Sequence, residues 1–366
     1  MKPSLRKRLL PYFLGGCWIA LWWLSPFFIH PSVKISLPNT CLSGIDRELL
    51  KKSLAGDINS MHRLLKEWHR NEADELVYQE ALAALETVQK TPPQASEKCF
   101  FPQTYPSACF LMALASSQSI ISLPRGFTHR EKVFELTANI PEFPHSYAEF
   151  LWRRKPCCSF ISVYSNPSFV TTLRALQIPY QKAKACHSIQ EVSAGIRTVG
   201  QLTYSSAKAE LLILFMQAAL LAIDQELKLS YVKRKISPQS LRKVFLFHHL
   251  HYTLPNASSL TGELLKRLDF TDLGNHPGFQ DTLIHLEQLH AMDPDLLIIA
   301  SADLRHLEKE LSTTPLFARL KASQKNTIFY VNSIIQHSPT QFLVLAYYDI
   351  VQGMLHFLNQ KESLCH

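Results

Sequence analysis

The sequence predicts an α/β protein made of two three-layer lobes that one long helix joins. Short apolar runs rich in Ile, Val and Phe alternate with segments of helical periodicity, which is typical of largely parallel sheets. A junction between a helix and an apolar run occurs twice, at Pro156 and Pro294, each seven residues after a glutamate (Glu149 and Glu287). Between the two copies, residues 205–232 contain neither proline nor glycine. These observations indicate two related α/β units and a helical connection about 40 Å long.

The N-terminal segment predicts a membrane anchor. Residues 9–29 carry no charge and are long enough to cross a hydrocarbon core of about 30 Å. A basic cluster, Lys2, Arg6, Lys7 and Arg8, precedes them, so we expect residue 1 in the cytoplasm and the rest of the chain outside. A cleaved signal peptide is one alternative. A lipoprotein signal is another, because residues 14–17 (LGGC) resemble a lipobox.

The residues after the anchor predict a linker and a small helical prefix. Residues 31–43 have the composition of an exposed linker, and residues 45–90 place apolar side chains at helical spacing. A proline pair at 92–93 closes this segment. A packing role is expected for the prefix, and a partner-binding module is the alternative.

We therefore divide the chain into five parts: 1–30 (anchor or signal), 31–97 (linker and prefix), 98–204 (N-terminal α/β lobe), 205–235 (connecting helix) and 236–366 (C-terminal α/β lobe). The expected strands are 119–122, 160–163, 179–182, 244–247, 270–273, 296–300 and 327–331.

Composition and motifs exclude several classes of function. A chain with 46% hydrophobic and 19% charged residues belongs with packed globular proteins rather than disordered ones. Its charge of +8 is spread along the chain, so no nucleic-acid partner is expected. Nucleophile-elbow, P-loop and dinucleotide motifs are missing from the sequence, and we expect no enzymatic activity. The eight cysteines match no zinc spacing; disulfides are permitted outside the cytoplasm, but the sequence does not give their pairing.

Several segments occur in an order that a known family shows. They are 106–114 (PSACFLMAL), Glu149 with Lys155-Pro156 and the apolar run that follows, 172–179 (TLRALQIP), 259–265 (SLTGELL) and 293–299 (DPDLLII). Together they resemble the class III, helical-backbone periplasmic substrate-binding proteins of ABC importers for iron chelates, haem and vitamin B12. The resemblance covers roughly residues 100–358. It implies a binding protein without a cofactor of its own, whose transported ligand is an iron chelate, haem or cobalamin.

The same resemblance implies an ABC permease in the inner membrane as partner, and a location on the periplasmic or extracytoplasmic face of that membrane. Family members often carry a glutamate in the first helix of each lobe, where it can meet basic residues of the permease. Glu263 fits this permease-docking role in the second lobe, whereas Cys109-Phe110 occupies the comparable place in the first. Lys155-Pro156 is followed by Cys157 rather than aspartate.

Polar residues after the predicted strands give the candidate ligand site, because ligands bind beyond the carboxyl ends of strands in open α/β sheets. The first wall would hold Ser107, Arg125, Phe127, Tyr164 and Asn166. The second would hold His249, His251, Tyr252, His276, Ser301, Asp303, Arg305 and Gln336. Arg125, Arg305 and Tyr164 suit an anionic ligand such as a ferric chelate or haem propionates.

Three alternatives stay open. The His248–His251 region suggests direct binding of a metal ion, although only His249 and His251 would share a strand face. A metalloenzyme built on the same histidines is a further possibility. The missing acid in the first lobe and the added prefix suggest a membrane-tethered interaction protein that keeps the fold without transport.

Overall fold

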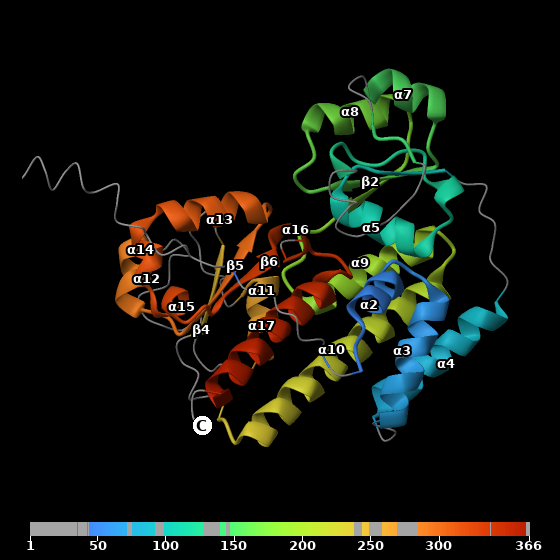
Figure 1. Cartoon of the computed structure of the whole chain (residues 1–366). Coiled ribbons are helices and arrows are strands. Elements are labelled where there is room, and N and C mark those ends of the chain that lie inside the picture. The colour runs from blue at the N-terminus through green and yellow to red at the C-terminus, as the bar shows by residue number, and fades with distance from the viewer. Residues whose placement is uncertain are drawn as a thin grey trace, which may run out of the picture.

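The protein folds around two separate parallel sheets. The structure, a computed structural model, describes Ile35, Leu42 and residues 44–71, 75–91, 99–127, 140–143, 147–237, 244–248, 258–268, 285–336 and 338–363. Within these residues each sheet has three strands, in the orders β1-β2-β3 and β4-β5-β6. Figure 1 shows the two sheets in different parts of the molecule, each with its own helices.

The first sheet is built from β1 (Phe100–Pro102), β2 (Cys158–Ser162) and β3 (Tyr180–Ala183). It is parallel, with Phe101 opposite Ser159 and Phe160 opposite Gln181. Successive residues of a strand point to opposite faces, so Phe160 enters the central core while its neighbour Ile161 enters an outer core. The helices of this lobe are α5 (Tyr105–Leu114), the short η2 (Ser117–Ser119), α7 (Tyr147–Arg154), α8 (Pro167–Ala175) and α9 (Ile189–Leu202).

The second sheet repeats this plan with β4 (Val244–His248), β5 (Leu296–Ser301) and β6 (Ile328–Asn332). All six residues of β5 are buried, as expected for the central strand of a sheet covered on both faces. Leu296 and Ile298 face the central core, and Leu297 and Ile299 face a second apolar cluster. The helices of this lobe are α11 (Leu260–Lys266), α12 (Leu286–Met292), α13 (Leu304–Thr313), α14 (Pro315–Ala318), α15 (Lys321–Gln324), α16 (Ser333–Gln336) and α17 (Leu343–Ser363).

The two proline junctions have the same geometry. Helix α7 ends before Lys155, whose φ is 41°, and α12 ends before Asp293, whose φ is 44°. A left-handed residue stops a helix and redirects the chain, and the proline after it cannot continue the helix. The structure therefore confirms that each half contains a helix, a proline stop and a buried strand.

Helix α10 (Ser206–Arg234) is the unbroken connection that the sequence predicts. It is 29 residues long, and it contacts α4 (Leu76–Lys90), α9 and α17. In the described part of the chain it is the one helix long and apolar enough to cross a membrane, but 61% of its apolar window is buried in the protein. Its position between packed helices makes it a core helix.

The predicted prefix forms three helices, α2 (Arg47–Leu54), α3 (Ile58–Asn71) and α4. They share the central core with α10 and both lobes. The Trp68 ring stacks on Phe215 of α10 with centroids 5.6 Å apart, and the Tyr78 hydroxyl donates a 2.7 Å hydrogen bond to Gln225. Figure 1 shows these helices beside α10 on the side of the first lobe. The prefix is thus packed against the connecting helix.

Side chains of all three parts meet around α17. Gln341, which is fully buried, donates hydrogen bonds from Nε2 to the carbonyl oxygens of Leu54 (3.2 Å) and Cys109 (3.0 Å). Asp224 of α10 accepts from the Tyr347 hydroxyl (2.6 Å) and pairs with Arg267 beyond α11 (2.5 Å). These bonds tie the prefix, the first lobe and the second lobe to one pair of helices.

Some expectations differ from the structure. The strand predicted at 119–122 is reduced to a single bridge between Ile120 and Phe100, because η2 occupies the residues before it. Strand β1 was not among the predicted strands; its third and last residue is Pro102, which makes it too short to show a pattern. The strand predicted at 270–273 and the anchor at 1–30 lie outside the described residues.

Candidate functional site

The carboxyl ends of the strands carry the candidate site. Strand β2 ends at Ser162 and β5 ends at Ser301, and a polar loop follows each of them. Ligands of open α/β sheets bind outside this edge, where loops rather than sheet hydrogen bonds position the side chains. The loops that follow the strands of both lobes are therefore the candidate site.

Three of the predicted binding residues cap helices. The Ser107 side chain completes a capping box with Thr104 at the start of α5, and only 3% of Ser107 is exposed. Asn166 Oδ1 accepts from the Ser168 amide (2.9 Å) at the start of α8. Asp303 Oδ1 accepts from the amides of the first turn of α13. Caps accept hydrogen bonds from the amides at a helix N-terminus that have no intrahelical partner. These side-chain oxygens therefore already make hydrogen bonds that stabilise the fold.

The loop after β2 is held in place by hydrogen bonds. Ser165 Oγ accepts from the Ser162 amide (2.9 Å) and donates to Gln103 Oε1, which joins the ends of β1 and β2. The Tyr164 amide donates to Ser162 Oγ (2.8 Å). The Tyr164 side chain is 83% exposed, so a fixed backbone presents it to solvent.

Arg125 lies in a second loop of the same lobe. The next residue, Gly126, has a φ of 73°, and its amide donates to Glu142 Oε2 (3.0 Å). Phe127 is 1% exposed, with its ring 5.1 Å from that of Tyr105. Phe127 therefore belongs to the core that anchors the loop, whereas Arg125 is exposed.

The second lobe offers Arg305 in the first turn of α13. Its side chain is exposed, while Ser301, at the end of β5, is buried. Among the residues that the structure describes, no carboxylate pairs with the guanidinium of Arg305 or of Arg125. Each lobe thus presents, in a loop or first helical turn, an exposed arginine with no carboxylate partner among the described residues, and such a positive charge would attract an anionic solute.

Burial and two carboxylates shape the electrostatics nearby. Burial first, and then the negative charges of Asp303 and Asp349, raise the pKa of Tyr330 on β6 to about 12. Tyr330 is therefore a neutral phenol at physiological pH. It can donate a hydrogen bond but cannot carry a negative charge.

Glu263, the predicted docking acid, accepts a hydrogen bond within the protein. Its Oε2 lies 2.8 Å from the backbone nitrogen of Ile189, the first residue of α9. The predicted role at a permease remains a prediction. No sequence pattern indicates this contact, because a backbone amide 74 residues away carries no residue-type signal.

The remaining predicted residues all belong to the second wall. His249, His251, Tyr252 and His276 lie outside the described residues, and Gln336 ends α16. His248 is the last residue of β4. Within the described ranges, no group of three His, Cys, Asp or Glu side chains could hold a metal ion.

Comparisons with known proteins give the family resemblance. Residues 161–334 match a family model described as periplasmic binding protein. The Fe(3+)-citrate-binding protein YfmC of Bacillus subtilis (strain 168) is 33% identical over 79 residues, which is 21% of this chain. The aligned segment covers 24% of YfmC, so this chain matches about a quarter of the length of that relative.

Two solved structures share the fold over most of their length. The periplasmic heme-binding protein BhuT, in complex with two hemes, has a TM-score of 0.56 and 14% identity over 71% of this chain and 99% of BhuT. The periplasmic heme-binding protein HutB of Vibrio cholerae has a TM-score of 0.55 and 16% identity over 71% of this chain and 100% of HutB. These relatives are named as binding proteins and not as enzymes. The resemblance predicted from the motifs is confirmed: residues 161–334 match the periplasmic binding protein family, and the chain shares the α/β fold of these solved structures.

Proposed function

We propose that this chain is the extracytoplasmic solute-binding component of an ABC-type importer, and that it binds an anionic iron chelate or haem between its lobes. The observation that carries the proposal is a pair of exposed arginines that no described carboxylate pairs with: Arg125, in a loop between β1 and β2 of the first lobe, and Arg305, just after β5 of the second. The names of the relatives, which bind ferric citrate or haem, support the same ligand class.

The chemistry of the site suits capture and release rather than reaction. A guanidinium gives forked, charge-assisted hydrogen bonds to carboxylates, the groups that citrate and haem propionates share. Tyr164 adds an exposed ring and hydroxyl on a backbone held by Ser162 and Ser165. Helix α10 would limit closure of the lobes to small movements.

Residues 9–29 would hold the protein at the inner membrane beside its permease, with the folded part on the periplasmic side. This placement follows the charge pattern of the N-terminal segment and the extracytoplasmic location that the family resemblance suggests.

The test is a titration of the purified full chain, kept in detergent, with ferric citrate and with haemin. We expect saturable binding of at least one of them and none of citrate alone. Arg125→Ala and Arg305→Ala should each weaken binding about tenfold, the equivalent of one charge-assisted contact. Arg154→Ala is the matched control, because Arg154 is exposed in the same lobe but lies before β2. If neither ligand binds at concentrations far above the micromolar range, the proposal is contradicted.

A second candidate is a membrane-tethered interaction protein that keeps this fold without transport. Helix α5 contains no acid and is mostly buried, and Glu263 is engaged within the chain. Helices α5 and α11 therefore present no pair of free glutamates for docking. Absence of binding and of thermal stabilisation by both ligands, in a protein that unfolds cooperatively, would favour this candidate.

A further inference from the structure

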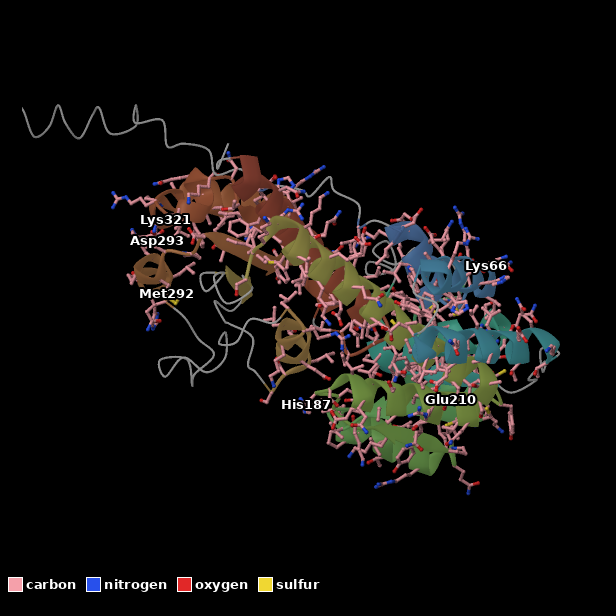
Figure 2. All side chains as sticks on the ribbon, turned by 90° about the horizontal axis from the view of Figure 1, so that it is seen from below. Lys66, His187, Glu210, Met292, Asp293 and Lys321 are labelled. Atoms are coloured by element: carbon pink, nitrogen blue, oxygen red, sulfur yellow. The ribbon has the colours of Figure 1, made fainter. Side chains whose placement is uncertain are left out.

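Besides the bond from Gln341 to the Cys109 carbonyl, a second hydrogen bond crosses directly between the lobes, at the start of α9. The donor is the Ile189 amide of the first lobe, and the acceptor is Glu263 Oε2 on α11 of the second lobe, 2.8 Å away. Figure 2 labels His187, two residues before Ile189, beside the part of the ribbon where the lobes approach each other.

The Ile189 amide needs an acceptor from outside its own helix. Helix α9 is 14 residues long, and the first amides of a helix have no intrahelical partner. Ser188 Oγ accepts from the Glu191 amide (3.1 Å), and Glu191 Oε2 accepts from the His187 amide (2.6 Å). The side chains of this turn thus accept hydrogen bonds from other amides, and the Ile189 amide donates to the second lobe instead.

The acceptor is well matched to this position. A carboxylate is stabilised at a helix N-terminus by the helix dipole, and a bond to a charged acceptor is stronger than a neutral one. Glu263 itself sits on a fixed turn, since Ser259 caps α11 and Leu264 and Leu265 are buried. The carboxylate therefore cannot follow α9 far if the lobes separate.

We propose that Glu263 is a positioning residue that holds the two lobes at their observed separation through the Ile189 amide. A shift of about 1 Å between α9 and α11 breaks the bond, because it takes the 2.8 Å contact well outside the range of about 2.7–3.2 Å of N–H···O hydrogen bonds. The bond is thus present in one arrangement of the lobes and lost in another. This role does not depend on the proposed transport function; only if the chain docks on a permease must Glu263 leave Ile189 first.

The test is residue-resolved amide hydrogen exchange on the full chain in detergent, without ligand. In Glu263→Ala we expect the Ile189 amide to exchange at least about tenfold faster, while the amides of Glu191 and Val192, bonded to Ser188, stay unchanged. Glu263→Gln keeps an acceptor and should restore part of the protection. Glu191→Ala is the matched control: it frees the His187 amide and leaves Ile189 protected.

A second measurement separates positioning from local capping. Spin labels on non-natural residues at the exposed positions Ala175 and Lys309, one in each lobe, report the inter-lobe distance. We expect the distance distribution to broaden in Glu263→Ala and to stay narrow in Glu191→Ala. Unchanged exchange at Ile189, or an unchanged distribution in a folded Glu263→Ala, would overturn the proposal.

Discussion

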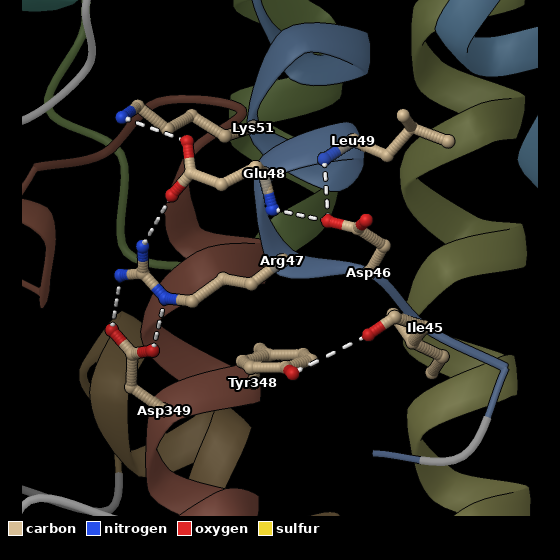
Figure 3. A network of polar contacts seen from close by, with 8 residues as sticks. All are labelled: Ile45, Asp46, Arg47, Glu48, Leu49, Lys51, Tyr348 and Asp349. Carbon is tan, nitrogen blue, oxygen red and sulfur yellow. Dashed lines mark hydrogen bonds and ion pairs between the residues drawn. The ribbon is translucent and has the colours of Figure 1, made fainter. Parts of the chain in front are cut away.

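The ion pair between Arg47 and Asp349 should couple the prefix to the C-terminal helix. Arg47 opens α2, and Asp349 lies on α17, 302 residues later. Figure 3 shows the two-point contact: Nε to Oδ1 at 2.7 Å and Nη2 to Oδ2 at 2.9 Å. The hydrogen bonds to Asp349 are the largest cause that raises the pKa of Arg47, so the guanidinium stays charged near neutral pH.

The size of this coupling follows from burial. A hydrogen bond to a charged group contributes about 1.5–3 kcal/mol, and two would give more in a dry site. The Arg47 side chain is 33% exposed and that of Asp349 is 14% exposed, so solvent screens part of the interaction. We expect a coupling energy of about 2 kcal/mol.

The assay is a double-mutant cycle in urea with Arg47→Met, Asp349→Asn and the double variant. Arg197 and Glu210 provide a matched control, because they also make a two-point contact (2.6 and 3.1 Å) but are 47% and 46% exposed. That pair should couple by less than about 1 kcal/mol. A coupling of Arg47 and Asp349 below about 0.5 kcal/mol would refute the reasoning.

Two further changes test the packing around α17. Gln341→Met removes both hydrogen bonds to the buried carbonyls of Leu54 and Cys109. Urea titrations should show a free energy of unfolding lower by about 2–4 kcal/mol. A loss below about 1 kcal/mol would contradict the role of this side chain. Burial beside Phe329 lowers the pKa of His356 below its usual 6.5, so the unfolded chain takes up the proton more readily and stability falls as the pH drops below that value. His356→Gln should therefore lose less stability than the original chain between about pH 7 and about pH 5, and an equal loss in both would exclude this histidine as the cause.

The large elements of the fold could be predicted from local patterns. A proline stop followed by an apolar run identifies β2 and β5, and the absence of proline and glycine from 205–232 identifies α10. These patterns act within one element, so the sequence displays them directly. Strand β1 has three residues and ends in Pro102, which leaves no pattern to detect.

The candidate site was harder to predict, because caps and ligand contacts use the same residue types. Ser107, Asn166 and Asp303 follow strands, as ligand-binding residues do. Their side-chain oxygens nevertheless accept hydrogen bonds from amides at the start of helices α5, α8 and α13. Contacts such as Glu263 with Ile189 join positions far apart in the chain through a backbone amide. From the sequence alone, neither the hydrogen-bond partner of Glu263 nor the distance between the two atoms could be inferred.

The central claim is that a solute is held between two lobes, and a footprint of the bound ligand tests it most directly. Amide exchange of the full chain would be compared by mass spectrometry with and without saturating ferric citrate or haemin. We predict added protection in the loops at 162–166 and 301–306, one in each lobe, and little change in the prefix helices α2–α4. Protection confined to one lobe, or centred on the prefix, would contradict the account.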